Sequence, residues 1–119
     1  MVLVVEDDAA LRTLVVRVLE RQGYTVRQAA DAQALRRHLA QYSLDVVLLD
    51  LVLEGESGVR LAEEIEGASP GSRVLFMSGH AREHLPPEHT PPAGSVLLKK
   101  PFAPSALTRA VKEILEEGA

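Results

Sequence analysis

The stretch that decides the fold is Val46-Val47-Leu48-Leu49-Asp50, in which four consecutive apolar residues lead into a carboxylate. A run without polar alternation is typical of a strand that is buried on both faces, as in a parallel sheet. The chain begins in the same way, because the apolar residues 2–5 lead directly into Glu6-Asp7-Asp8. We therefore expect two central strands of a parallel sheet, each followed by acidic residues.

Helical and strand-like segments alternate along the rest of the chain. Apolar residues recur at helical spacing in four segments, which follow Asp8, Asp31, Ser57 and Ala103. Shorter apolar runs predict further strands at 24–28, 73–77 and 95–98. Five strands separated by helices predict an α/β fold, with a single doubly wound five-stranded parallel sheet and helices on both of its faces.

The segment between the fourth and fifth predicted strands breaks this rhythm. It contains Pro86, Pro87, Pro91 and Pro92. Because proline interrupts helical hydrogen bonding, room remains for only about two turns of helix. We expect a fourth helix that is short or irregular, with 81–85 as its helical part.

Length and composition narrow the function classes. A chain of 119 residues is expected to be one domain, 1–119. With no cysteine, disulfides and thiolate metal sites are excluded. The longest apolar runs are far shorter than the roughly 18 residues of a membrane span, and acidic residues follow the first run at once, unlike a signal peptide. We therefore expect a cytoplasmic protein that does not enter a membrane.

Charge and motifs argue against nucleic acid and nucleotides as ligands. The formal net charge is −4, and the chain has two Phe, two Tyr and no Trp for stacking on bases. Neither G-x-x-x-x-G-K nor G-x-G-x-x-G occurs.

Charged and hydroxyl residues follow four of the five predicted strands. They are Glu6-Asp7-Asp8, Asp50, Ser78-Gly79 and Lys99-Lys100. Open parallel sheets bind ligands at the carboxyl ends of their strands, so these residues share one edge. If the first and third strands are neighbours, the carboxylates crowd together, which favours a bound hard cation such as Mg²⁺ or Ca²⁺ or the protonation of some acids. A carboxylate beside a divalent cation, facing a lysine and a serine, suits phosphoryl transfer.

Each of these signals also has an ordinary structural explanation. Asp7 or Asp8 could cap a helix, Asp50 could be a turn residue, Ser78-Gly79 could be only a turn, and lysines before a proline are usually solvated. The occurrence of all four signals at successive strand ends favours a functional site. His80 and His84, four residues apart, could share a helical face, but without a third ligand we interpret them as solvated side chains rather than a zinc site.

These motifs resemble the receiver domain of two-component response regulators, a domain similar to the chemotaxis regulator. The resemblance covers nearly the whole chain. The resemblance is carried by residues 2–8, 45–50, 74–79 and 99–102. The sequences Phe-Met-Ser-Gly and Leu-Leu-Lys-Lys-Pro-Phe are most similar to those found in receivers of hybrid sensor histidine kinases. The resemblance implies a flavodoxin-like fold with strand order 2-1-3-4-5.

The resemblance also implies roles for individual residues. Asp50 would accept a phosphoryl group from the phosphohistidine of a histidine kinase or a histidine phosphotransfer protein. Asp7 would bind Mg²⁺ directly and Glu6 through water, and Asp50 and the backbone carbonyl of Val52 would complete the protein ligands. Asp8 is then interpreted as a helix cap.

The remaining implied roles concern the phosphoryl oxygens. Lys100 would pair with them, and the Ser78 hydroxyl and the Gly79 amide would donate hydrogen bonds to them. The peptide bond between Lys100 and Pro101 is expected to be cis.

Three features depart from the family pattern. Leu53 and Glu54 stand where a Met-Pro pair is common, and Leu97 stands where a switching Tyr or Phe is frequent. The prolines at 86–92 truncate a surface that many receivers use for dimerisation, so we expect a monomer.

Three functions stay open at this point. The favoured one is a phospho-accepting receiver that catalyses only its own phosphorylation and dephosphorylation, and is not otherwise an enzyme. The second is a pseudo-receiver that binds a protein partner without phosphate. The third is a small phosphatase that forms an aspartyl-phosphate. The chain could be a stand-alone receiver or a piece of a larger sensor kinase.

Overall fold

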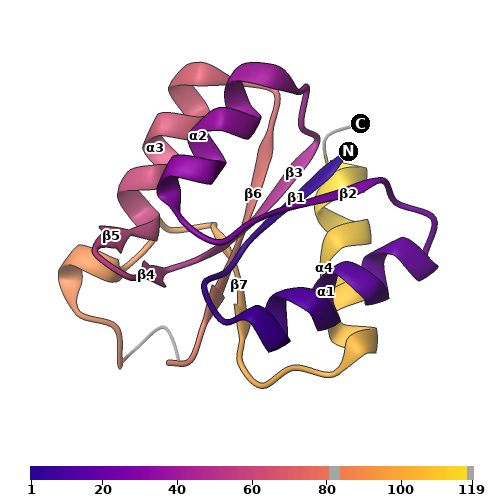
Figure 1. Cartoon of the computed structure of the whole chain (residues 1–119). Coiled ribbons are helices and arrows are strands. Elements are labelled where there is room, and N and C mark those ends of the chain that lie inside the picture. The colour runs from indigo at the N-terminus through magenta and orange to yellow at the C-terminus, as the bar shows by residue number, and fades with distance from the viewer. Residues whose placement is uncertain (81–83, 118–119) are drawn as a thin grey trace.

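A five-stranded parallel sheet forms the centre of the computed structural model, which describes residues 1–80 and 84–117. The strand order is β2-β1-β3-β6-β7, as Figure 1 shows. The strands are β1 (Val2–Val5), β2 (Val26–Ala29), β3 (Val46–Asp50), β6 (Arg73–Ser78) and β7 (Val96–Lys99). Numbered along the chain, these five strands have the predicted order 2-1-3-4-5, so the fold class is confirmed.

Two pairs of helices cover the sheet, one pair on each face (Figure 1). The helices are α1 (Ala9–Arg21), α2 (Ala32–Gln41), α3 (Gly58–Ala68) and α4 (Pro104–Glu117). Leu3 and Val5 pack toward α2 and α3, whereas Val2 and Val4 pack toward α1 and α4. Because successive strand residues point to opposite faces, a strand covered on both sides must be apolar throughout.

Aspartates begin the first two helices. Asp8 Oδ1 accepts a hydrogen bond from the Leu11 amide at 3.1 Å, and Asp31 Oδ1 accepts one from the Ala34 amide at 2.8 Å. Such caps give a hydrogen-bond partner to amides that have none within the helix. Each cap contributes about 1 kcal/mol to the free energy of unfolding. The interpretation of Asp8 as a helix cap is confirmed, and Asp31 caps the helical segment that was expected to follow it.

A short hairpin follows β3, where the sequence indicated only a turn. It consists of β4 (Val52–Leu53) and β5 (Glu56–Ser57), which pair antiparallel. Gly55 turns the chain with φ of 78°, a conformation that side chains other than hydrogen disfavour. The hairpin brings the segment after β3 back toward the sheet edge, where α3 begins.

The connection from β6 to β7 contains a 3₁₀ helix, η2 (Pro87–His89). This short element agrees with the short or irregular helix that was expected between the fourth and fifth strands. The helical segment expected at 81–85 falls mainly on residues that lie outside the described ones. Within residues 1–80 and 84–117, no helix has the length and apolar character needed to cross a membrane.

Candidate functional site

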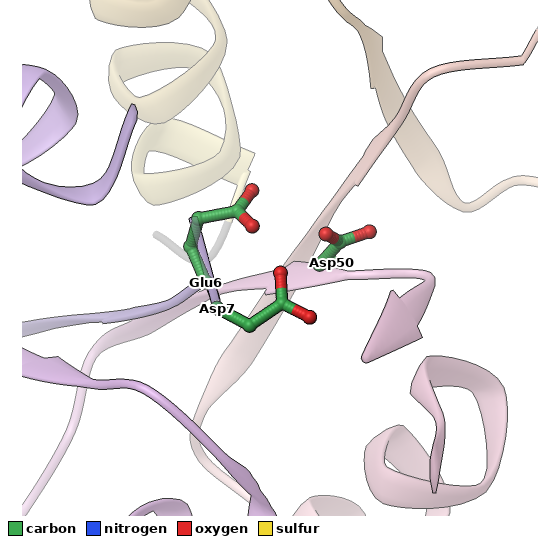
Figure 2. Close-up of side chains that lie close together, drawn as sticks. All are labelled: Glu6, Asp7 and Asp50. Carbon is green, nitrogen blue, oxygen red and sulfur yellow. The ribbon is translucent and has the colours of Figure 1, made fainter. Parts of the chain in front are cut away.

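Three carboxyl groups meet at the carboxyl ends of β1 and β3. The register pairs Val5 with Leu49, so Glu6 and Asp7 follow β1 beside Asp50 at the end of β3. Oxygen atoms of Glu6, Asp7 and Asp50 lie within 4.8 Å of one another. Figure 2 shows the three side chains grouped at the ends of the two strands. Glu6 is 1% exposed and Asp50 is 7% exposed, whereas Asp7 is open to solvent. The predicted crowding of carboxylates is therefore present.

Lys100 reaches this cluster from beyond the end of β7. Its Nζ donates to Glu6 Oε1 at 2.5 Å and to Asp50 Oδ2 at 2.9 Å. The Lys100 amide donates to the Ser78 carbonyl at 2.7 Å, which fixes the start of the side chain. The peptide bond between Lys100 and Pro101 is cis, as expected. One ammonium beside three carboxylates leaves two formal negative charges in the cluster.

Burial and neighbouring charges shift the proton affinities of this group. Burial raises the pKa of Glu6 to about 7, with a smaller contribution from the Asp50 charge, although the Lys100 hydrogen bond opposes the shift. Burial disfavours the Lys100 ammonium, but its hydrogen bonds to Glu6 and Asp50 outweigh this effect and raise the pKa of Lys100. The cluster therefore binds a proton at Glu6 more readily than a solvated glutamate would.

Backbone amides hold each of the three carboxylates. Asp8 donates to Glu6 Oε2 at 3.1 Å, Val52 donates to Asp50 Oδ1 at 3.1 Å, and Glu54 donates to Asp7 Oδ2 at 3.3 Å. Two of these amides come from β4 and the turn after it. The hairpin therefore helps to orient Asp7 and Asp50, a role that the sequence did not indicate.

The first residue of α3, Gly58, packs closely against the backbone of Asp50 and Leu51. A Cβ atom on Gly58 would lie 2.4 Å from the Asp50 carbonyl oxygen and 2.7 Å from Leu51 Cα. The Gly58 amide donates to the Leu51 carbonyl at 2.8 Å. The sequence did not single out Gly58, since only the tertiary approach of α3 to β3 leaves no room for a side chain unless the backbone shifts.

Ser78 ends β6, the strand next to β3. The register pairs Asp50 with Met77, so Ser78 lies one residue beyond the end of β3. Its side chain is buried, and its Oγ accepts a hydrogen bond from the His80 amide at 3.0 Å. Gly79 and His80 follow at the exposed edge. The phosphate-binding roles of Ser78, Gly79 and Lys100 stay predictions.

Other residues singled out from the sequence lie around the cluster. The side chains of Val52 and Glu54 are exposed, and Leu53 is buried. Leu97 of β7 is partly buried and packs into the core beneath α2 and α3. His80 and His84 are both exposed and are not part of the acidic cluster, which is the group of potential metal ligands found among the described residues.

The acidic cluster fits a hard divalent cation. All three side-chain ligands are oxygens, which Mg²⁺ and Ca²⁺ prefer. Mg²⁺ binds oxygen at about 2.0–2.1 Å, so two ligands on opposite sides of it lie about 4.2 Å apart. The ligand oxygens of the three residues lie within 4.8 Å of one another, close enough for small side-chain rotations to bring them around one ion. Glu6, Asp7 and Asp50 are thus the residues that could hold such an ion.

Fold and site together define the class of protein. The response regulator receiver domain family matches residues 2–112, so the chain belongs to this family. The resemblance drawn from the sequence is therefore confirmed.

Individual relatives support the same assignment. The chain is 33% identical over 118 residues to the sensor kinase CckA of Brucella abortus, covering 98% of this chain but only 12% of that protein. It is 27% identical to the response regulator receiver protein CpdR of the same organism, covering 96% of this chain and 95% of CpdR. The receiver domain of NtrX from Brucella abortus superposes with a TM-score of 0.86 at 28% identity, and the coverage is 98% of both chains.

Proposed function

We propose that this chain is a phospho-accepting receiver that takes a phosphoryl group onto Asp50 and thereby changes its contacts with a partner protein. The observation that carries the proposal is the environment of Asp50. Its Oδ2 is bound by Lys100 at 2.9 Å, and its carboxylate shares a cluster with Glu6 and Asp7. A buried carboxylate next to an ammonium and two further acids suits a nucleophile that works beside a divalent cation.

The donor in this proposal is a phosphohistidine of a histidine kinase or of a histidine phosphotransfer protein. An Asp50 carboxylate oxygen attacks phosphorus as the bond from phosphorus to the imidazole nitrogen breaks, and the bond electrons stay on that nitrogen. The amide of Val52 holds Asp50 Oδ1, which leaves Oδ2 as the oxygen oriented by Lys100. The chain holds the nucleophile in place before the donor arrives.

Glu6, Asp7, Asp50 and the backbone carbonyl of Val52 would hold Mg²⁺. The cation would supply positive charge for the phosphoryl oxygens. Lys100 would exchange its bond to Asp50 for one to a phosphoryl oxygen, because the phosphorylated Asp50 no longer carries the same charge on Oδ2. The Ser78 hydroxyl and the Gly79 amide would donate to the remaining oxygens. The chain then catalyses its own phosphorylation and dephosphorylation and acts on no separate substrate.

The first test is the intact mass of the chain after incubation with a small acyl phosphate and Mg²⁺. We expect a single phosphoryl adduct that requires Mg²⁺ and disappears in Asp50→Asn. Asp45→Asn is the matched control, because Asp45 is an exposed aspartate at the opposite end of β3, paired with the Met1 amino group. No adduct on the folded native chain would contradict the proposal and favour a phosphate-independent protein-binding module.

We further propose that the chain acts as a cytoplasmic monomer, without direct nucleic-acid binding. This rests on the formal charge of −4 and on the prolines of the connection from β6 to β7, whose described residues include the 3₁₀ helix η2. Sedimentation of the native chain with and without the phosphodonor tests this. A dimer that forms on phosphorylation would contradict the monomer.

A further inference from the structure

Arg12 links α1 to the ends of two strands. Its Nη1 donates to the backbone carbonyl of Glu6 at 2.7 Å, and its Nε donates to Gln28 Oε1 at 3.0 Å. Gln28 belongs to β2 and Glu6 follows β1, so one guanidinium joins three elements. Nothing in the function proposed above uses this side chain.

The carbonyl that Arg12 binds belongs to the acidic loop. The parallel ladder of β1 with β2 and β3 ends at Val5, and the Glu6 amide makes the last bond, to the Ala29 carbonyl at 3.1 Å. The Glu6 carbonyl lies beyond that ladder, and Arg12 is the partner that it accepts from. A charged donor makes this hydrogen bond stronger than a neutral one.

Fixing this carbonyl also fixes the residue that follows it. The Glu6 carbonyl and the Asp7 amide belong to one planar peptide unit, so the direction of the carbonyl sets where the Asp7 backbone begins. Asp7 is the exposed member of the cluster, and the backbone hydrogen bond to its carboxylate, from the Glu54 amide, is long at 3.3 Å. Glu6 and Asp50, in contrast, are buried and bound by Lys100. Asp7 is therefore the carboxylate that depends most on its backbone for its position.

We propose that Arg12 is a positioning residue for the cation site, which holds the Asp7 carboxylate beside Glu6 and Asp50 by fixing the peptide unit between Glu6 and Asp7. The inference rests on the proposed function, because it concerns the cation that this function uses. Gln28 takes part indirectly, since its carboxamide restrains the guanidinium. Side chains that orient metal ligands in this way commonly change metal affinity by tenfold or more when they are replaced.

Simple electrostatics predicts the opposite sign for the same substitution. Arg12 is a cation near a cation site, so removing its charge without moving any ligand would tighten Mg²⁺ binding. A purely structural role would lower thermal stability and leave the affinity of the folded chain unchanged. The sign of the affinity change therefore separates positioning from both alternatives.

The experiment is calorimetric titration of the metal-free chain with Mg²⁺ alone, for the native chain and three variants. Arg12→Gln is expected to bind about tenfold more weakly. Gln28→Ala changes no charge and is expected to bind two- to threefold more weakly. Arg17→Gln, an exposed arginine on the same helix, removes an equal charge and is expected to bind as the native chain does. Thermal unfolding confirms that each variant is folded at the titration temperature.

The outcomes separate this inference from the proposed function. Native-like or tighter binding by Arg12→Gln would overturn the positioning role while leaving the native cation site intact. Failure of the native chain itself to bind Mg²⁺ would instead overturn the proposed function, and the inference with it. If Arg12→Gln does not fold, Gln28→Ala decides the question, because native affinity in that variant would contradict the restraint on Arg12.

Discussion

Replacing Gly58 by alanine should disturb both the stability of the fold and the chemistry of Asp50. The added Cβ would lie 2.4 Å from the Asp50 carbonyl oxygen, 2.7 Å from Leu51 Cα and 3.0 Å from the Leu51 carbonyl oxygen. All three are backbone atoms of a buried segment, so none can rotate away as the end of a flexible side chain could. Either α3 or the end of β3 must move by several tenths of an ångström.

The magnitude follows from two opposing effects. Overpacking of a well-packed interior destabilises by about 1–3 kcal/mol, whereas replacing a helical glycine by alanine gains at most about 1 kcal/mol. Because Gly58 is the first residue of α3, the helical gain is at its smallest there. We expect a net loss of about 2 kcal/mol in the free energy of unfolding, which lowers the Tm by about 6–10 °C in a chain of this size.

The assay combines urea unfolding with the rate of phosphoryl adduct formation. Gly67→Ala is the matched control in the same helix, because an added Cβ there meets no atom within 4 Å, and it should be neutral or stabilising by up to about 1 kcal/mol. Gly58→Ala should also form the adduct more slowly at a temperature at which it is fully folded, since the displaced carbonyl belongs to Asp50 itself. Native stability together with a native adduct rate in Gly58→Ala would refute this reasoning.

Three further predictions concern the polar groups of the site. The pKa of Glu6 is about 7 in the folded metal-free chain, above the ordinary 4.5. Protonation of Glu6 therefore contributes its whole share of the free energy of unfolding below pH 4.5, and this contribution is lost as the pH rises through 7. Mg²⁺ affinity should rise over the same range, and urea unfolding and Mg²⁺ titration at pH 5–8 should both become less pH-dependent in Glu6→Gln. Lys100→Met should destabilise the metal-free chain by about 1–3 kcal/mol at pH 8, because it leaves buried carboxylate oxygens without their donor. The loss should be smaller at pH 5, where Glu6 binds a proton; an equal loss at both pH values by urea unfolding would count against this. Ser78→Ala should slow adduct formation about tenfold but change stability by less than about 1 kcal/mol, because the amide that its hydroxyl binds belongs to the exposed His80, which water can reach. A normal adduct rate in that variant would remove Ser78 from the chemistry.

The fold was predictable because its strongest signal is local. Apolar runs without alternation, at 2–5 and 46–49, arise only where both faces of a strand are covered, so they indicate both the sheet and its helices. The sequence also indicates the helix starts at Asp8 and Asp31, because a cap accepts a hydrogen bond from an amide only three residues away. The β4–β5 hairpin could not be predicted from the sequence, because strands of two residues are too short to show a periodic pattern.

The clustering of Glu6, Asp7 and Asp50 was predictable, but the geometry around it was not. The order of strand ends brought Glu6, Asp7 and Asp50 into one prediction, because parallel strands end at the same edge. The bonds of Lys100 to both Glu6 and Asp50 join residues 94 and 50 positions apart, and no local pattern encodes such contacts. The close approach of Gly58 likewise depends on how α3 packs against β3.

The charge balance of the cluster connects its stability to its proposed chemistry. Three carboxylates and one ammonium leave a formal charge of −2, and two of the carboxylates, those of Glu6 and Asp50, are buried. Burying such charge is unfavourable, so the metal-free chain lowers it by binding a proton at Glu6 near neutral pH. A divalent cation offsets the same charge, and must displace that proton to do so. A phosphoryl group on Asp50 would bring about two negative charges of its own, so the cation and Lys100 would be needed more after the transfer than before it. Proton, cation and phosphoryl group are therefore coupled through one buried charge, and a substitution that changes the binding of one should change the binding of the other two.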